Sequence, residues 1–292
     1  TDLQVNGEIT TSEAPDMGSD LIVTDVYQGN SSGSVTMTFL YRHAIYEPFL
    51  EAALWGTKDV NEEIFIGRDE KTFGFEVWMP TMNRYRRVTG CTARSINWSL
   101  SAGDNLLQVT IEFVSQRPTW ESSSFDSAPT DWDHTQQPHN LLQANGGVFI
   151  STSFDPVTWV LHNPSAFSLT VERNTANIPG ASTEGPQGVV PKGKARISGS
   201  VSLVITDTTE VNWWNSNTPV SLSVQSSAIG NNAETFFAIC RRVRWTGEGP
   251  PAGDDALIAE MPFTAVTASD GVASNAFRVN LDGGQISAGP VS

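Results

Sequence analysis

The segment Leu106–Val114 contains a strict alternation of apolar and polar residues from position 107 to position 113. Its apolar members are Leu107, Val109, Ile111 and Phe113, and its polar members are Gln108, Thr110 and Glu112. Successive side chains of a β-strand point to opposite faces of a sheet, so a period of two indicates a strand. We therefore predict a strand here with one face on a core and the other on water.

Strand patterns recur along most of the chain. They cover Leu21–Val26, Ser34–Tyr41, Thr72–Met79, Tyr85–Trp98, Gly147–Phe154, Thr158–Leu161, Phe167–Arg173, Ala195–Thr206, Pro219–Ser226, Glu234–Trp245, Ala256–Thr267 and Phe277–Leu281. A Gly-Asn-Ser-Ser-Gly turn at Gly29–Gly33 is expected between the first two. The 24 Gly, 16 Pro and many Val, Ile and Thr residues are typical of β-rich chains with frequent turns. We expect a mainly β protein.

Two short segments have a helical pattern instead. Ala44–Gly56 places its apolar residues near helical spacing, has Pro48 early and offers Gly56 as a C-cap. In Asp207–Asn215, Asp207 or Thr208 could cap a helical turn.

The composition shifts to Pro, Ser, Asp, His, Gln and Asn between Gln116 and Gly147. Such a stretch is the natural place for a domain boundary. We therefore predict a first domain over residues 1–118, a polar linker or excursion over 119–146 and a second domain over 147–292. The aromatic residues Trp120, Phe125 and Trp132 predict that the excursion lies against a surface.

The two halves share short features in the same order. The triplet Ala-Gly-Asp occurs at Ala102–Asp104 and at Ala252–Asp254, an offset of 252 − 102 = 150, and Cys91 and Cys240 are 240 − 91 = 149 residues apart. The strand Val35–Phe39 before the first helix corresponds to Ile197–Val204 before the second. Several matches at a near-constant offset indicate an internal duplication.

Charge and cysteine content limit the function further. Lys and Arg total 17 against 32 Asp and Glu, a net charge of −15, whereas tight binding to a nucleic acid backbone needs a cationic footprint. The acidic balance either repels DNA or only keeps the protein in solution. The first twenty residues contain no secretory signal pattern, so we expect the two cysteines to be buried, reduced thiols at matching sites.

No residue pattern for catalysis or metal binding stands out. The nucleophile, Walker and dinucleotide motifs are absent, and His134 and His139 match no zinc-binding spacing, so we expect them in a solvated loop. We predict no enzyme, no catalytic or metal-binding residue and no cofactor. No stretch reaches the roughly 18 apolar residues of a membrane helix.

Nine tryptophans leave two alternatives open. Exposed tryptophans on a β-sandwich can stack on sugars, which would suit an adhesin or carbohydrate-binding module. The other reading, which we favour, places them in the core and in subunit interfaces.

The stretch Gly90–Asp104 (GCTARSINWSLSAGD), followed by a strand, resembles the core of phage tail tube proteins. In that family a strand beginning with Gly-Cys runs into a turn and a final barrel strand. The second half is similar over Phe167–Asn174, Lys194–Thr206 and Cys240–Trp245. The resemblance covers roughly Leu21 to Val266 and leaves the excursion outside the pattern.

The resemblance implies two tandem tail-tube-type β-sandwich or barrel domains, each with a short flanking α-helix. It implies a structural virion protein whose stacked rings form the phage tail tube through which DNA passes during ejection. Single-domain members assemble as hexamers around an inner β-barrel, so a duplicated chain would form trimeric, pseudo-hexameric rings. The implied partners are other copies of the chain, the tape measure protein, the tail terminator and tip proteins, and DNA in transit. The implied location is the phage tail, assembled in the cytoplasm of a bacterial host, without a membrane.

Five residues are expected to face the channel of such a tube. They are Gln108, Thr110 and Glu112, with Glu260 and Thr264 as their counterparts in the second half. A wall of acidic and neutral groups would not hold phosphates, so DNA would slide past it.

The Gly- and Pro-rich loop Asn174–Gly193, which contains Pro179, Glu184 and Pro191, is the candidate for contacts between rings. Loops of this length in compact domains are usually functional or disordered.

Overall fold

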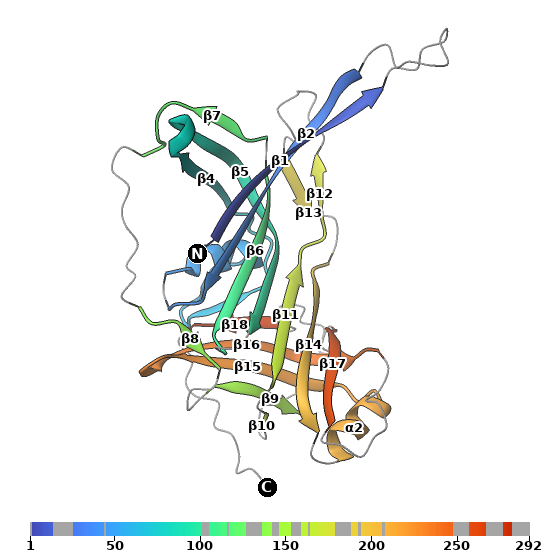
Figure 1. Cartoon of the computed structure of the whole chain (residues 1–292). Helices are drawn as coiled ribbons and strands as arrows, with labels where there is room; N and C mark the ends of the chain where they lie inside the picture. The colour runs from blue at the N-terminus through green and yellow to red at the C-terminus, as the bar shows by residue number, and fades with distance from the viewer. Residues whose placement is uncertain are drawn as a thin grey trace.

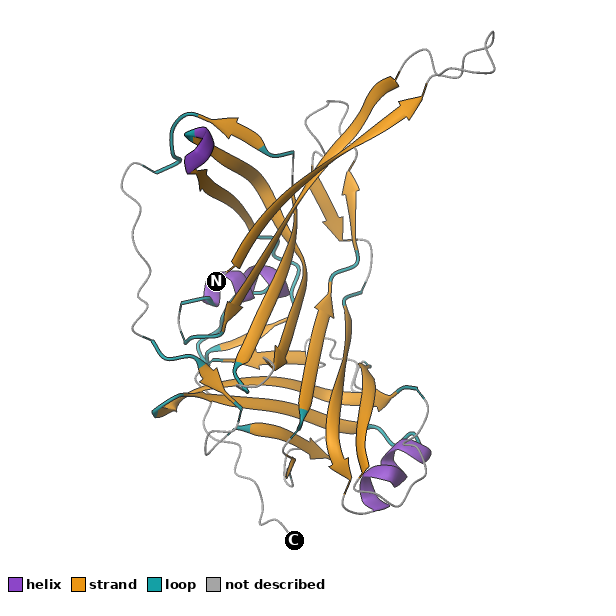
Figure 2. Ribbon diagram, in the orientation of Figure 1, coloured by secondary structure: helices purple, strands orange, loops and turns teal. Residues whose placement is uncertain are grey.

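The computed structural model describes residues 2–13, 26–43, 45–100, 105–115, 117–126, 136–141, 146–152, 159–162, 164–178, 188–191, 194–205, 208–247, 257–266 and 277–281. Strands dominate this part of the chain, as Figure 2 shows, and the mainly β prediction is confirmed. Within these ranges, no helix is long and apolar enough to cross a membrane.

The first half contains β1 (Asp2–Glu13), β2 (Val26–Leu40), α1 (Glu47–Leu54), β3 (Glu63–Phe65), β4 (Thr72–Met79), η1 (Pro80–Met82), β5 (Arg84–Leu100) and β6 (Leu107–Ser115). The excursion contributes β7 (Thr119–Glu121) and β8 (His139–Asn140). The second half contains β9 (Gly147–Ser151), β10 (Val160–His162), β11 (Ala166–Glu172), β12 (Thr175–Ile178), β13 (Gly188–Pro191), β14 (Arg196–Ile205), α2 (Thr208–Asn215), β15 (Val220–Ala228), β16 (Asn231–Trp245), β17 (Leu257–Ala265) and β18 (Phe277–Asn280).

One antiparallel sheet joins most of the strands in the order β1-β2-β6-β5-β11-β14-β17-β16-β15-β9-β10. Figure 1 shows two parts of it in different directions: β6, β5, β11, β14 and β17 run lengthwise, while β15 and β16 cross them near one end. The sheet therefore folds back on itself and forms two layers.

The core lies between these layers. Trp98 on β5 is fully buried, and its ring centroid lies 6.3 Å from that of Phe236 on β16 and 6.0 Å from that of Phe277 on β18. The ring centroid of Tyr41, just after β2, lies 4.7 Å from that of Phe236. Residues of both halves thus share one set of aromatic contacts, which stabilise the packing of the two layers.

The two halves repeat one strand order. In the first half β1-β2-β6-β5 are neighbours and β4 also pairs with β5, whereas in the second β11-β14-β17-β16 are neighbours and β15 follows. A helix follows β2 in the first half and β14 in the second. An internal duplication predicts this correspondence, strand by strand.

The halves are nevertheless continuous with each other. Strand β5 pairs with β11 from Ser95 to Ser99, and the late strand β18 pairs with β3 in the first half. The division into two domains therefore remains a prediction.

Strand pairing can be compared between the halves. Phe113 on β6 lies opposite Ala93 on β5, and Phe263, 263 − 113 = 150 residues later, lies opposite Trp245 on β16. Cys91 precedes Ala93 by two residues, whereas the second cysteine precedes Trp245 by five. Because these pairs fix only the sum of the offsets on the two paired strands, the matching of the cysteines at equivalent sites remains a prediction. The Ala-Gly-Asp triplets lie outside the described residues. Both thiols are buried and free.

Helix α1 is shorter than predicted and ends differently. Trp55, not Gly56, is the C-cap and adopts the left-handed conformation with φ 51°. Two contacts hold this conformation: Trp55 Nε1 donates to the carbonyl oxygen of Ala93 at 3.1 Å, and the Arg173 guanidinium lies 4.8 Å from the indole centroid. Because tertiary contacts hold it, a residue other than glycine is tolerated at this position.

A long hairpin arm of β1 and β2 projects from one end of the molecule (Figure 1). The predicted turn at Gly29–Gly33 is wrong, because these residues continue β2; Gly33 pairs with Gly7, and Ser31 with Ile9. Backbone hydrogen bonds between the arm strands need no apolar pattern, so the sequence did not mark β1 as a strand. Of the predicted strand Leu21–Val26, only Val26 lies within the described residues.

Candidate functional site

One face of the long sheet is polar across eight neighbouring strands. Its central row of paired residues, from β1 to β16, is Asp2, Thr38, Thr110, Asn97, Thr170, Ser198, Thr264 and Arg244. A second row is Gln4, Thr36, Glu112, Ser95, Glu172 and Arg196, and a third is Gln108, Ser99, Ser168 and Ser200, while Ser202 lies opposite Glu260. We call these residues the polar face; all are half-buried or exposed.

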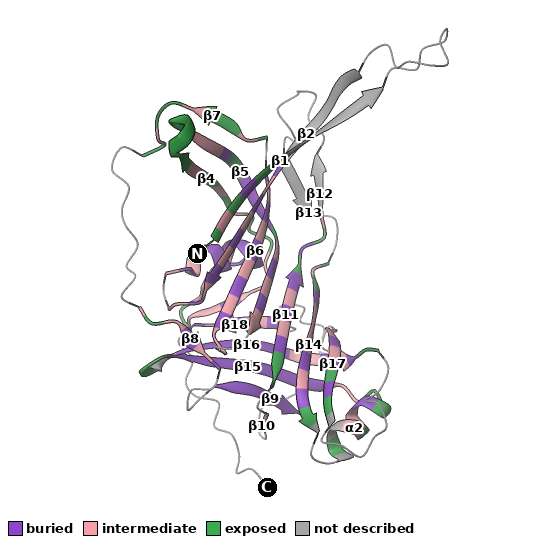
Figure 3. Ribbon diagram, viewed as in Figure 1, coloured by how far each residue is buried: buried purple, intermediate pink, exposed green. Residues whose placement is uncertain are grey.

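Alternation along the strands produces this face. On β6, Leu107, Val109, Ile111 and Phe113 are fully buried, while the residues between them are not. The same alternation appears as bands of burial along β6 in Figure 3. The two-faced strand predicted from the sequence is confirmed.

Short side chains of the polar face hydrogen-bond to their cross-strand neighbours. The Thr38 and Thr110 hydroxyls are 3.1 Å apart, and Asn97 Nδ2 donates to Thr170 Oγ1 at 2.7 Å. The hydroxyls of Ser168 and Ser200 are also 3.1 Å apart. Cross-strand pairs of this kind link neighbouring strands and occupy part of the hydrogen-bonding capacity of the polar face.

The charges of the polar face are few and mainly negative. Its carboxylates are Asp2, Glu112, Glu172 and Glu260, and its cations are Arg196 and Arg244. Ser95 Oγ donates to the Glu112 carboxylate at 3.2 Å. A surface of hydroxyls, amides and a slight excess of carboxylates hydrates well and attracts polyanions weakly.

The structure brings the five predicted channel residues onto this one face. Thr110 and Thr264 belong to the same row, whereas Glu260 is exposed opposite Ser202. That the face lines a channel remains a prediction.

The polar face ends in an open edge at β1. Within the described part of the chain, β1 pairs only with β2, whereas its counterpart β11 pairs with β14 and with β5. An unpaired edge carries free N–H and C=O groups that a further strand can bind.

The predicted ring-contact loop contains a hairpin. Strands β12 and β13 pair from Thr175 opposite Pro191 to Ile178 opposite Gly188. Asn174 is exposed just before this hairpin, and Pro179 and Glu184 lie outside the described residues. The hairpin projects toward the same end of the molecule as the arm (Figure 1).

A second surface, missed by the sequence analysis, lies at the end of the β4–β5 hairpin. Large apolar side chains that remain exposed gather here: Trp78, Met79, Met82, Trp120 and Phe125. Figure 3 shows exposed residues along η1 and β7. We call the end of β4, η1, the start of β5 and residues 119–126 the tip. The run Arg-Tyr-Arg-Arg at residues 84–87 was the available sequence signal.

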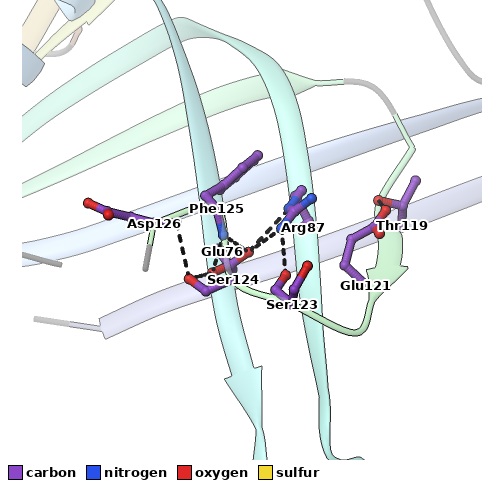
Figure 4. Close-up of polar contacts among 8 residues, drawn as sticks. All are labelled: Glu76, Arg87, Thr119, Glu121, Ser123, Ser124, Phe125 and Asp126. Atoms are coloured by element: carbon purple, nitrogen blue, oxygen red, sulfur yellow. Dashed lines mark hydrogen bonds and ion pairs between the residues drawn. The ribbon is translucent and has the colours of Figure 1, made fainter. Parts of the chain in front are cut away.

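A half-buried ion pair fixes the excursion to the tip (Figure 4). Glu76 on β4 accepts hydrogen bonds from Arg87 Nη2 at 2.9 Å, from Ser124 Oγ at 2.6 Å and from the Phe125 amide at 3.1 Å. The Arg87 guanidinium also lies 3.9 Å from the Phe125 ring centroid and donates to the carbonyl oxygen of Ser123. Although burial alone raises the pKa of Glu76, the hydrogen bonds from Ser124, Arg87 and Phe125 bring it below its usual value.

The contacts of Trp120 and Phe125 agree with an excursion that lies against a surface. Arg86 is 5.8 Å from the Trp120 ring centroid, and β7 pairs with β5. Trp132 lies outside the described residues.

The histidine prediction is wrong for His139. This residue is fully buried on β8, where its ring lies 4.7 Å from that of Tyr41 and its Nδ1 lies 3.2 Å from Ser226 Oγ. The end of the excursion pairs with β15, which removes the side chain from solvent. Burial lowers the pKa of His139 to about 3, so the ring is neutral. His134 lies outside the described residues.

Tryptophan burial favours the core reading. Five of the nine are buried: Trp55, Trp98, Trp159, Trp214 and Trp245. Trp78 and Trp120 are exposed, and both belong to the tip. Among the described residues, no group of three or more His, Cys, Asp or Glu side chains could hold a metal ion.

The chain matches a known protein family. A family model described as phage tail tube protein matches residues 3–265, nearly the whole chain. No curated protein matches it. The matched range contains every residue of the polar face except Asp2, and the whole tip.

Proposed function

The chain belongs to the phage tail tube protein family, and from this premise we propose that three copies form a ring whose polar faces line a central channel. Family membership makes the protein a structural component of the virion tail that self-assembles into a tube. In our proposal the rings stack, and the viral DNA passes through the channel during ejection.

The strand order carries the proposal. Each chain supplies two units with the same order, and inside the chain β5 of the first unit pairs with β11, the first strand of the second. If β16 of one copy meets β1 of the next in the same way, the open edge of β1 is paired. Three chains of two units each then give a closed ring with pseudo-sixfold symmetry.

The chemistry of the polar face suits a channel for DNA. Carboxylates outnumber guanidinium groups on it, and most other positions carry Ser, Thr, Asn or Gln. Gln108, Thr110, Glu112, Glu260 and Thr264 would thus face DNA that must not be retained, because phosphates find few cations to bind.

Further partners follow from the position of such a tube in a tail. A tape measure protein would occupy the channel before ejection. A terminator protein and the proteins of the tail tip would close the two ends of the tube. We propose assembly in the cytoplasm of the bacterial host. The β12–β13 hairpin with its connecting residues 179–187 is a candidate for contact between rings. Replacing residues 175–191 by a short Gly-Ser link should leave the fold intact and prevent tube growth.

An alternative function, a two-domain binding module, has one observation in its favour. Trp78 and Trp120 are both exposed at the tip and could stack on sugars. The burial of five other tryptophans and the family match favour the tube.

Electron microscopy of the purified protein tests the proposal. Rings or tubes with a central hole are expected on concentration. A monodisperse monomer that binds glycans on an array would contradict the tube and support the binding module.

A further inference from the structure

In each half, two strands follow one another along the same edge of the longest strand of that half. On β5, β6 pairs with residues 92–100 and β7 with residues 85–87, both on the side opposite β4. On β16, β17 pairs with residues 243–245 and β18 with residues 237–240, both on the side opposite β15. Strand β7 of the first half is therefore the counterpart of β18 in the second.

The outer edge of β18 is occupied within the chain. It pairs with β3 of the first half, and Arg278 Nη1 lies 2.7 Å from Glu63 Oε1 across this pairing. The chain after β3 turns back onto the end of α1, where the Gly67 amide donates to the carbonyl oxygen of Leu54 at 3.0 Å. The second half thus docks beside the helix of the first half through β18.

The outer edge of β7 is open. Within the described part of the chain, β7 pairs only with β5. Its residues Thr119 and Trp120 are exposed, and the Trp120 side chain is 46% exposed. An open strand edge with a large apolar side chain beside it is a surface that a partner can cover.

Helix α2 is open as well, in contrast to α1. Most side chains of α1 are buried: Phe49, Leu50, Ala52, Ala53 and Leu54. Of the α2 side chains that the structure describes, only Trp214 is buried, whereas Trp213 is half-buried and Asn212 exposed. Residues 55–71 follow α1 and include β3, but only residues 216–219 separate α2 from β15. The second half therefore has no strand in the place of β3.

The repeat brings these two open surfaces together in a ring. Within the chain, β18 reaches the α1 side of the first half across the junction of β5 with β11. In the proposed ring, the counterpart of this junction joins β16 of one copy to β1 of the next. At that counterpart junction, β7 of the next copy comes to lie beside α2 of the first copy.

This contact lies on the side of the sheet away from the polar face. The Phe49 ring of α1 lies 6.4 Å from that of Phe113, which is on the buried face of β6. Trp214 of α2 belongs to the same hydrophobic core. Both helices are thus on the core side, so docking beside α2 leaves the proposed channel wall free.

We infer that β7 of each copy docks beside α2 of the neighbouring copy in the same ring, as β18 docks beside α1 within the chain. This inference rests on the proposed function and adds a second, outer contact to the pairing of β16 with β1. Trp120 and Trp213 supply aromatic surface of the kind enriched at interfaces. The exposed amides of Asn212 and Asn215 can hydrogen-bond to the free N–H and C=O groups of the β7 edge, where a counterpart of β3 is missing.

A pair of engineered cysteines tests the inference. Trp120→Cys and Asn212→Cys are combined in the full chain, because both native side chains are exposed. The native Cys91 and Cys240 are buried and do not compete for the reagent. Strand β7 and helix α2 lie at opposite ends of the molecule (Figure 1), so a short bismaleimide can link the new thiols only between copies.

The two single variants and a second pair are the controls. The control pair combines Trp120→Cys with Ile229→Cys, since Ile229 is also exposed but lies at the other end of β15 from α2. Electron microscopy verifies rings, circular dichroism verifies the fold, and a denaturing gel counts linked chains. We expect the 120–212 pair to give linked products that stop at three chains, and the controls to remain unlinked.

The outcomes separate the inference from the proposed function. Rings without linked chains from the 120–212 pair, or equal linking in the control pair, would overturn the inference and leave the ring standing. Products of more than three chains would also overturn it, because the contact would not close within a trimeric ring. If neither wild type nor variant forms rings and no chains are linked, both are contradicted.

Discussion

The side-chain amide of Asn97 donates a hydrogen bond to the hydroxyl of Thr170, 2.7 Å away. Asn97 is on β5 of the first half and Thr170 on β11 of the second, so this bond joins the two halves in the middle of the polar face. In the proposed ring, the junction between neighbouring copies is the counterpart of this junction within the chain.

Thr170→Val should lower the free energy of unfolding by about 1 kcal/mol, because it leaves the Asn97 amide with one partner fewer. Urea denaturation followed by tryptophan fluorescence measures the change. The control is Thr264→Val in the same row, whose hydroxyl makes no side-chain hydrogen bond within the described residues. Equal effects of the two substitutions would show that the junction bond contributes nothing of its own.

Adjacent positions of β6 should respond in opposite ways to a lysine. Gln108→Lys is expected to change the free energy of unfolding by less than about 0.5 kcal/mol, since the side chain is on the polar face. Val109→Lys buries an unpaired charge and should abolish folding. The urea midpoint of the first variant and the soluble yield of the second are the measurements. Similar tolerance at both positions would contradict the assignment of the two faces.

Acid should release the excursion from the tip. The folded pKa of Glu76 is below its ordinary value of 4.5, so the Glu76–Arg87 contact stabilises the native state above that pH and is lost as the pH falls through the folded pKa. The measurement is limited proteolysis by pepsin of samples transferred to a series of acidic pH values. Pepsin should cut within residues 119–126 only below about pH 4.5. Glu76→Gln should be cut at every pH tested. A wild-type protein whose cleavage does not depend on pH would contradict this role of Glu76.

Both cysteines should resist alkylation in the native protein. Cys91 and Cys240 are fully buried, and burial raises the pKa of each thiol to about 12, so little reactive thiolate exists at pH 8. Mass spectrometry after iodoacetamide treatment should find no adduct on the folded protein and two in guanidinium chloride. A denatured protein that takes up none without reductant would mean that a disulfide is present.

The strand framework was predictable because its signal is local. The alternation on β6 and the matching order of elements in the two halves follow from the pattern of single residues, and strand pairing agrees with both. The arm was not predictable, because β1 and the first part of β2 pair through the backbone and show no apolar period.

Contacts distant in sequence account for the other differences. The left-handed Trp55 depends on Ala93 and Arg173, and the burial of His139 depends on Ser226 and Tyr41. No window of neighbouring residues contains this information. The tip escaped prediction for the same reason, since residues from 76 to 126 create it together.

Cryo-electron microscopy of tubes assembled from the wild-type protein tests the central proposal most directly. We predict three chains per ring, with Gln108, Thr110 and Glu112 of each chain on the channel wall. A ring of six chains, or a map in which these three side chains point away from the channel, would contradict the account.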